Sequence, residues 1–148
     1  FQQGDENEWT KLIRIGNLGD WNLTMALKQI QQPNFDPEGL FFLQYKDEIV
    51  GTAWGLNGLG NDKKTGQLHF VAVAPKHQGK GLSYTLCSAV LHYLRTRCCR
   101  AYLLTDEWRL GAIMIYLRLG FRPNFKSDFD RQRWKDALIS LKGSRAIS

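Results

Sequence analysis

The sequence lacks any long apolar run. None of its 148 residues lies in a stretch approaching the ~18 apolar residues that a membrane-spanning helix needs, so no membrane span is expected. The first seven residues, Phe1 to Asn7, are polar and acidic and have no apolar core, which argues against a secretory signal peptide. Because the chain begins with Phe rather than Met, we expect an upstream piece to be missing.

Cysteine is also scarce. The three cysteines are Cys87, Cys98 and Cys99, and an odd count with two adjacent members suits neither a disulfide framework nor the paired C-x2-C spacing of a zinc site. We therefore expect reduced thiols, a cytoplasmic protein and no bound metal. A hydrophobic content of 43% with 23% charged residues excludes wholesale disorder, and the length predicts one domain over residues 1–148.

Acidic residues are outnumbered. Twenty Lys and Arg against 14 Asp and Glu give a formal net charge of +6, which favours anionic partners. Nucleic acid, an acidic membrane and a polyphosphate cofactor all meet this condition. The tail is basic through Arg131, Arg133, Lys135, Lys142 and Arg145, so a nucleic-acid-binding module stays an alternative. It has no RNP, zinc or helix-turn-helix signature to support it.

The pattern of apolar residues predicts an α/β (α+β) fold with a mixed sheet covered by helices. Strands are expected over residues 9–15, 40–45, 48–56, 68–73, 101–104 (buried) and 121–125, and helices over 21–31, 82–97, 109–119 and 130–142. Lys46 and Asp47 should form a hairpin turn, Asp20 should cap the first helix, and Gly120 should end the third. Residues 58–66, rich in Gly and Lys, are expected to form an exposed loop.

The most informative segment is a Gly-rich turn between the strand at 68–73 and the helix at 82–97. Gly79 and Gly81 free the backbone N–H groups, the helix N-terminus adds partial positive charge, and Lys80 adds a full one. These features suit a pyrophosphate. The Walker A pattern fails here at Ala74 and Gly81, and the dinucleotide pattern G-x-G-x-x-G fails at Tyr84.

Two motifs resemble those of the GNAT-type N-acetyltransferases. Gln78 and Gly81 match the acetyl-CoA loop [QR]-x-x-G-x-[GA], with Ser83 as a small departure at its last position. Downstream, the pattern A-x-x-x-Y-x-x-x-G-F is matched by Ala112, Tyr116, Gly120 and Phe121. The resemblance covers roughly residues 40–123. It implies the GNAT acyl-CoA N-acyltransferase fold, with a mostly antiparallel mixed sheet whose central strands splay apart, and an acetyl-CoA-dependent transferase.

The resemblance also implies site residues. The pantetheine arm would pair with the backbone of Val71, Ala72 and Val73, and an N–H near Val71 would hold the thioester oxygen as charge develops. The pyrophosphate would lie on the six loop residues Gln78, Gly79, Lys80, Gly81, Leu82 and Ser83. Tyr116 would donate a proton to the leaving thiolate.

The base that deprotonates the amine stays open among His69, Glu107, Asp106 and water. An imidazole titrates near ~6.5, and strand alternation predicts that His69 projects to the same face as Val71. His69 could equally be an ordinary packed strand residue. For Asp106 and Glu107, the alternative role is helix capping. Arg109, where many members carry Asn, could contact the cofactor or pair with Asp106.

The acceptor is expected to be a primary amine on a small molecule or a protein, and Trp21 and Trp54 could line its pocket. The N-terminal helix, the loop at 58–66, the tail and a homodimer partner are the candidate sources of acceptor choice. Neither a membrane nor a nucleic acid is expected as partner. A catalytically silent CoA-binding regulatory domain is the other alternative.

Overall fold

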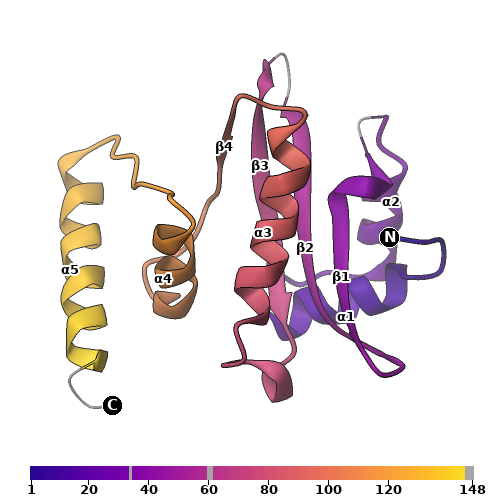
Figure 1. Ribbon diagram of the computed structural model, residues 1–148, viewed down its shortest axis with the longest axis horizontal. Helices are drawn as coiled ribbons and strands as arrows, with labels where there is room; N and C mark the ends of the chain where they lie inside the picture. Colours follow the sequence, from indigo (N-terminus) through magenta and orange to yellow (C-terminus); the bar gives the residue numbers. More distant parts are fainter. Residues whose placement is uncertain (34, 60–61, 146–148) are drawn as a thin grey trace. The chain divides into compact units, whose positions relative to one another are not determined.

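The computed structural model describes residues 1–33, 35–59 and 62–145, in two compact units (Figure 1). The first unit is Phe1–Leu103 and the second is Leu104–Ser148. No helix in the described ranges is both long enough and apolar enough to cross a bilayer. Those ranges also contain no cluster of three or more His, Cys, Asp or Glu side chains that could hold a metal ion.

The first unit is built on a four-stranded sheet with the order β1-β2-β3-β4 (Figure 1). Its strands are β1 (Leu40–Tyr45), β2 (Glu48–Leu59), β3 (Asp62–Val73) and β4 (Arg100–Tyr102). The pairs β1–β2 and β2–β3 are antiparallel, and β3–β4 is parallel. The expected mixed, mostly antiparallel sheet is therefore confirmed.

The hairpin between β1 and β2 is confirmed, with Lys46 in the left-handed region at φ 54°. The exposed loop expected over residues 58–66 is wrong, because strand pairing continues to Asn57↔Gly66 and Leu59↔Asp62. Gly60 and Asn61 of that segment lie outside the described residues. Gly66 serves close packing instead of a loop: a Cβ there would lie 2.7 Å from Leu94.

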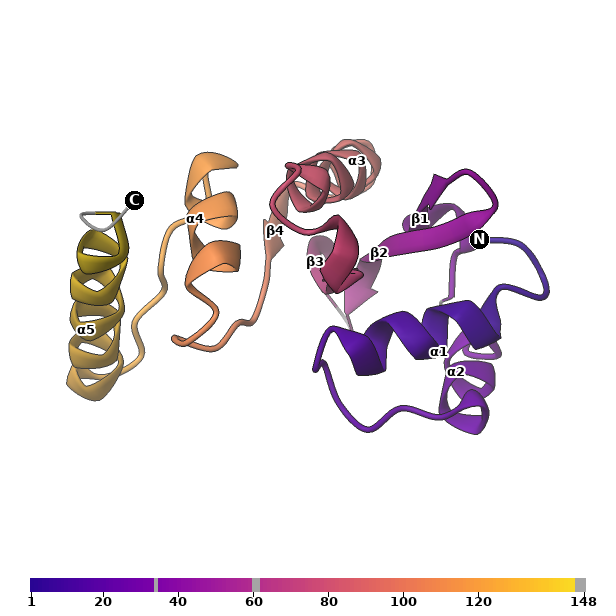
Figure 2. The same ribbon diagram turned by 90° about the horizontal axis from the view of Figure 1, so that it is seen from below.

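Helix α3 (Leu82–Arg95) covers one face of the sheet (Figure 2). It buries the expected Leu86, Val90 and Leu94, together with Cys87. Burial raises the pKa of the Cys87 thiol to about 12, so this cysteine is a core residue without nucleophilic chemistry. β4 was expected to be buried, and that is wrong. Arg100 and Tyr102 are exposed because β4 lies at the edge of the sheet.

Helices α1 (Glu6–Ile15) and α2 (Leu23–Ile30) cover the opposite face, and a 3-10 turn (Pro37–Gly39) leads into β1 (Figure 2). The strand expected over residues 9–15 is wrong. Trp9, Leu12 and Ile13 are all buried, at the spacing of one helical face. The expected helix that follows is confirmed, but its cap is Asn22, whose side chain accepts from the Met25 N–H, rather than Asp20.

The second unit consists of α4 (Leu110–Arg118) and α5 (Asp128–Arg145). Both expected helices are confirmed. The strand expected over residues 121–125 is wrong, since the described residues of this unit contain no strand. The N–H of Phe121, the first residue of that segment, is instead bonded to the carbonyl oxygen of Tyr116.

Candidate active site

Strands β3 and β4 part after a short contact. Their parallel pairing is confined to Thr65↔Arg100, Gly66↔Ala101 and Gln67↔Tyr102. From residue 68 to Val73, β3 continues with partners on β2 alone, and no strand among the described residues pairs with its other edge. β4 ends at Tyr102, so among the described residues β3 continues without a neighbour on that side, and the splay of two central strands stays a prediction. An unpaired edge can accept an extended ligand that carries amide groups, as an added strand does.

A β-bulge interrupts the pairing of β3 with β2 in the same stretch, residues 68–73. The pairs His69↔Trp54 and Thr52↔Ala72 leave two residues of β3 opposite Ala53 alone. One of the two is Phe70, whose φ of 46° lies in the left-handed region. A bulge disrupts the local ladder and redirects the backbone groups of the extra residue. The simple alternation that predicted His69 and Val71 on one face does not hold across it.

The Gly-rich loop follows a 3-10 turn (Pro75–His77) and leads directly into α3. Gly79 and Gly81 have φ of +75° and +76°, a conformation that costs glycine little and other residues more. A Cβ at either position would meet nothing within 4 Å, so the loop is open. In the part of the chain that is described, the backbone N–H groups of residues 79–83 donate no hydrogen bond. The loop thus offers consecutive donors to an anion.

Gln78 has a different place in this loop. Its side-chain Nε2 donates to the Val73 carbonyl oxygen at 2.9 Å, and its backbone N–H donates to the Pro75 carbonyl oxygen at 3.2 Å. Gln78 therefore ties the loop to the end of β3. The N–H groups that are open in this loop belong to the residues after Gln78.

His69 lies in an aromatic cluster. Its ring centroid is 3.7 Å from that of Phe70 and 6.1 Å from that of Trp54. Burial lowers the pKa of His69 to about 4, so the imidazole is neutral near pH 7 and is a weak base. Trp54 is only 1% exposed and packs against Trp9, so it lines no acceptor pocket. Trp21 packs on Phe70 at 4.6 Å and is partly exposed.

In the second unit, the residues of the downstream motif form the end of α4. The N–H of Phe121 donates to the Tyr116 carbonyl oxygen at 3.0 Å, and the N–H of Gly120 donates to the Leu117 carbonyl oxygen at 3.1 Å. Gly120 has φ +94°, and the rings of Tyr116 and Phe121 are 6.2 Å apart. These are the two hydrogen bonds and the apolar contact of a Schellman motif. The motif therefore fixes the end of the helix that carries Tyr116.

The carboxylates considered as bases are paired with guanidinium groups. Asp106 accepts from Arg109 Nε at 3.1 Å, as one of the two hypotheses for Arg109 predicted. Glu107 accepts from Arg133 of α5, and these hydrogen bonds hold the pKa of Glu107 below its usual range. Helix capping by Asp106 is wrong, because the residue before α4 is Arg109 and no side chain caps that helix.

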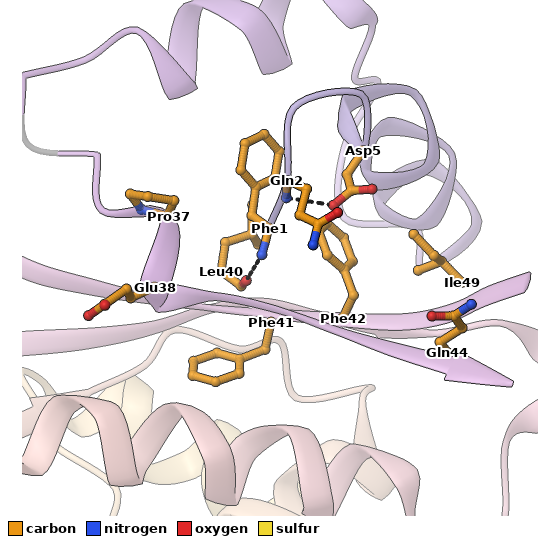
Figure 3. A pocket seen from close by; sticks show the side chains of 10 residues that line it. All are labelled: Phe1, Gln2, Asp5, Pro37, Glu38, Leu40, Phe41, Phe42, Gln44 and Ile49. Atoms are coloured by element: carbon orange, nitrogen blue, oxygen red, sulfur yellow. Dashed lines mark hydrogen bonds between the residues drawn. The ribbon is translucent and has the colours of Figure 1, made fainter.

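A cavity of about 400 Å³ lies elsewhere in the first unit, beside β1 (Figure 3). It is lined by Phe1, Gln2, Asp5, Pro37, Glu38, Leu40, Phe41, Phe42, Gln44 and Ile49. Its two carboxylates are already engaged, Asp5 by the Gln2 N–H and Glu38 by Arg97. None of the residues expected to hold the cofactor lines this cavity.

The structure therefore groups the predicted residues unit by unit. His69, the backbone of residues 71–73 and the loop at 78–83 lie on consecutive segments of the first unit, whereas Arg109 and Tyr116 lie in the second. Three features were missed: the bulge at Phe70, and the contacts that Gln67 makes with His69 and Tyr102. The sequence signal available for them was the polar Gln67 and His69 in an otherwise apolar run.

Comparisons with known proteins show the family to which this chain is related. The family profile described as "Acetyltransferase (GNAT) family" matches residues 7–121. The mycothiol acetyltransferase of Thermobispora bispora is 34% identical over 131 residues, which are 82% of this chain and 44% of that protein. That of Mycolicibacterium smegmatis is 36% identical over 131 residues, 80% of this chain and 43% of that protein. This chain thus spans less than half the length of these relatives.

Solved structures share the fold. A ribosomal-protein-alanine N-acetyltransferase from Brucella melitensis biovar Abortus superposes with a TM-score of 0.67 at 16% identity, covering 83% of this chain and 89% of its own. An aminoglycoside N-acetyltransferase in complex with CoA gives a TM-score of 0.67 at 17% identity, covering 86% of this chain and 88% of its own. The profile match over residues 7–121 and the sequence relatives above 30% identity show that the chain belongs to the acetyltransferase (GNAT) family.

Proposed function

We propose that this chain transfers the acetyl group of acetyl-CoA directly to a primary amine. The observation that carries the proposal is the order of two features along β3 and the loop after it. The unpaired edge at residues 68–73 comes first, and the open amides of residues 79–83 follow. This order matches that of the amide-bearing pantetheine arm and the pyrophosphate in CoA.

The backbone of Val71, Ala72 and Val73 is proposed to hold the pantetheine arm, and the loop to hold the pyrophosphate. Gly79, Gly81, Leu82 and Ser83 would contribute N–H groups. Lys80 would add its N–H and its ammonium charge, which suits a ligand carrying several phosphates. Gln78 would act by positioning, because both its amide Nε2 and its N–H are used within the protein. Arg109 is a further candidate for a phosphate contact through its guanidinium group.

Attack requires a neutral amine, and an alkyl amine has a pKa of ~10.4, so a proton must be removed near neutral pH. Among the groups considered, we propose water as its acceptor. The pKa of His69 near 4 makes this imidazole a weak base, and Asp106 and Glu107 are held by arginines. The backbone N–H near Val71 would stabilise negative charge on the thioester oxygen. Tyr116 would give the leaving thiolate its proton.

For the acceptor, we propose a small-molecule amine. Support comes from the sequence relatives, which are named mycothiol acetyltransferases and are 34% and 36% identical. The aromatic cluster around Trp21 and Phe70 supports an acceptor with an apolar or ring-bearing face. A protein amine is the competing acceptor class.

Thermal unfolding with acetyl-CoA, followed by a thiol-release assay against small amines and peptides, tests the proposal. At a hundredfold excess over Kd, acetyl-CoA should stabilise the protein by about 2.7 kcal/mol, a rise in Tm of roughly 5–10 °C. An acetylated pantetheine that lacks the pyrophosphate should bind at least about tenfold more weakly. No stabilisation at millimolar acetyl-CoA would contradict the proposal, and binding without turnover on any amine would favour a silent CoA-binding domain.

A further inference from the structure

The point at which β3 and β4 part carries a chain of side-chain hydrogen bonds. Gln67 and Tyr102 form the last pair between these strands, and the Tyr102 hydroxyl donates to Gln67 Oε1 at 3.2 Å. The other end of the same amide, Gln67 Nε2, lies 3.4 Å from His69 Nδ1. Gln67 is 7% exposed, so these bonds satisfy a buried amide that would otherwise be costly to desolvate.

This arrangement selects one form of the imidazole. A neutral imidazole has one donor nitrogen and one acceptor nitrogen, whereas an amide NH₂ group can only donate. When the Gln67 NH₂ group donates in this contact, the imidazole accepts at Nδ1 and carries its proton on Nε2. The Tyr102 hydroxyl bonds Oε1 at the other end of the amide and so holds the Gln67 side chain beside His69.

Packing holds the ring in this position. The imidazole packs against Phe70, at a centroid distance of 3.7 Å, and its centroid is 6.1 Å from that of the buried Trp54. The same burial lowers the pKa of His69 to about 4, so the imidazole is neutral near pH 7. Only the neutral ring carries its single proton on one nitrogen or the other. His69 also lies within the stretch of β3, residues 68–73, that has no strand on its other edge among the described residues.

We propose that Gln67, held beside His69 by its bond to Tyr102, is a positioning residue that donates to Nδ1 and keeps the proton of His69 on Nε2. His69 then acts in acetyl transfer as a hydrogen-bond donor and not as the base. The second statement rests on the proposed function, and the first does not. The Nε2–H adds to the backbone N–H near Val71 a second donor for the oxygen on which negative charge develops. The amine proton then leaves to water.

The substitution Gln67→Glu distinguishes the two possible roles of His69, hydrogen-bond donor and general base. A carboxylate has the size of the amide but only accepts, so it favours the proton on Nδ1 and raises the basicity of the imidazole. If His69 is a donor through Nε2, Gln67→Glu should lower kcat at least about tenfold and change the acetyl-CoA Kd by less than about threefold. If His69 is the base, the same substitution should leave kcat unchanged or raise it, which overturns the proposal.

The tautomer itself can be observed by ¹⁵N NMR of the imidazole nitrogens at pH 7.5. His77 and His92 are distinguished from His69 by their persistence in a His69→Gln variant. The wild-type protein should show a protonated Nε2 and an unprotonated Nδ1, and Gln67→Glu should reverse this pattern. A proton on Nδ1 in the wild-type protein overturns the positioning role whether or not turnover is found. Absence of turnover in the wild-type protein would instead contradict the proposed function and leave the positioning role standing.

Tyr102→Phe is the second variant, since Tyr102 is exposed and its loss should leave folding intact. Without the hydroxyl, the amide loses its partner at Oε1 and is held less firmly beside His69. The NMR spectrum should therefore show both tautomers, and kcat should fall by about two- to fivefold. Tyr45→Phe, at an exposed tyrosine on β1, is the matched control and should change neither. A Tyr102→Phe spectrum identical to that of the wild-type protein would remove Tyr102 from the proposal.

Discussion

The two sequence motifs use glycine in opposite ways. In the loop of the first unit, Gly79 and Gly81 turn the chain so that the N–H groups of residues 79–83 have no partner in the described protein backbone. At the end of α4, Gly120 turns the chain so that its own N–H and that of Phe121 close on the helix carbonyls. The first motif leaves donors open to a ligand, and the second uses its backbone groups to end a helix.

Substitutions in the two motifs should therefore change different properties of the protein: cofactor binding in the first, and stability or turnover in the second. A change in the loop should act on cofactor affinity, because its amides donate to no group within the described residues and are open to a ligand. A change at Gly120 should act on folding of its own unit, because the partners there are within the helix. Tyr116 is the one side chain of the second motif for which chemistry is proposed, so its hydroxyl should affect turnover alone.

The largest effect is expected at that hydroxyl. Tyr116→Phe removes the proposed proton donor and should lower kcat by about 10²-fold, the low end of general acid catalysis. The ring and its contact with Phe121 remain, so the acetyl-CoA Kd should stay within about twofold. Steady-state kinetics and calorimetric titration measure the two quantities. Weaker binding with unchanged kcat would assign Tyr116 to packing.

The first unit should also lose stability in mild acid through His69. Its pKa in the folded state is about 4, below the value of ~6.5 in the unfolded chain, so the unfolded chain takes up the proton first as pH falls. The contribution is complete above about pH 6.5 and is lost between there and pH 4. Allowing for its partial exposure, about 2 kcal/mol should disappear.

Urea unfolding of the wild-type protein and of His69→Gln at pH 7.5 and 4.5 checks this value. The variant lacks the titrating group, so its loss of stability between these pH values should be smaller by about 2 kcal/mol. An equal loss in both proteins would show that His69 has no depressed pKa in the folded state.

A smaller effect is expected in the loop. Gly81→Val places a β-branched side chain at φ +76°, which costs about 1–2 kcal/mol and should alter the loop. The acetyl-CoA Kd should rise about tenfold, with kcat at saturation changed less than affinity. Gly111→Ala is the matched control, because that glycine lies in α4 with open space around it and ordinary backbone angles. Equal affinity in the two variants would contradict the role given to the loop.

Gly120→Ala should cost about 1 kcal/mol, because alanine fits the left-handed end of α4 poorly. Gly111→Ala, in the same helix, should instead add about 0.5 kcal/mol. Chemical denaturation of both variants tests the pair. Acetyl-CoA affinity should be the same in both, and a larger loss of affinity at Gly120 than at Gly81 would reverse the comparison.

Local signals in the sequence predicted much of this molecule. The Gly-rich loop, the start of α3 and the stop at Gly120 depend on residues close together in the chain, and each is found where expected. The error at α1 arose because Trp9, Leu12 and Ile13 also suit an irregular alternation, and burial of all three decides for the helix. The glycines within 58–66 suggested a loop, but Gly66 is required by the close approach of Leu94.

The missed features depend on contacts between distant segments. The bulge at Phe70 is a property of the β2–β3 register, which no local pattern specifies. The bond from Tyr102 to Gln67 joins side chains 35 positions apart, and it exists only because β4 pairs with the first half of β3. His69 as a weak base follows from the rings of Trp54 and Phe70 that surround it.

The proposed function depends above all on binding of the cofactor's pyrophosphate by the open amides of residues 79–83. Titration of the ¹⁵N-labelled protein with CoA, followed by backbone amide NMR, tests it most directly. The largest shifts are expected at Gly79, Lys80, Gly81, Leu82 and Ser83, and they should be lost when a pantetheine without the pyrophosphate replaces CoA. Shifts confined to other segments, such as the cavity beside β1 that contains Gln44 and Ile49, would contradict it.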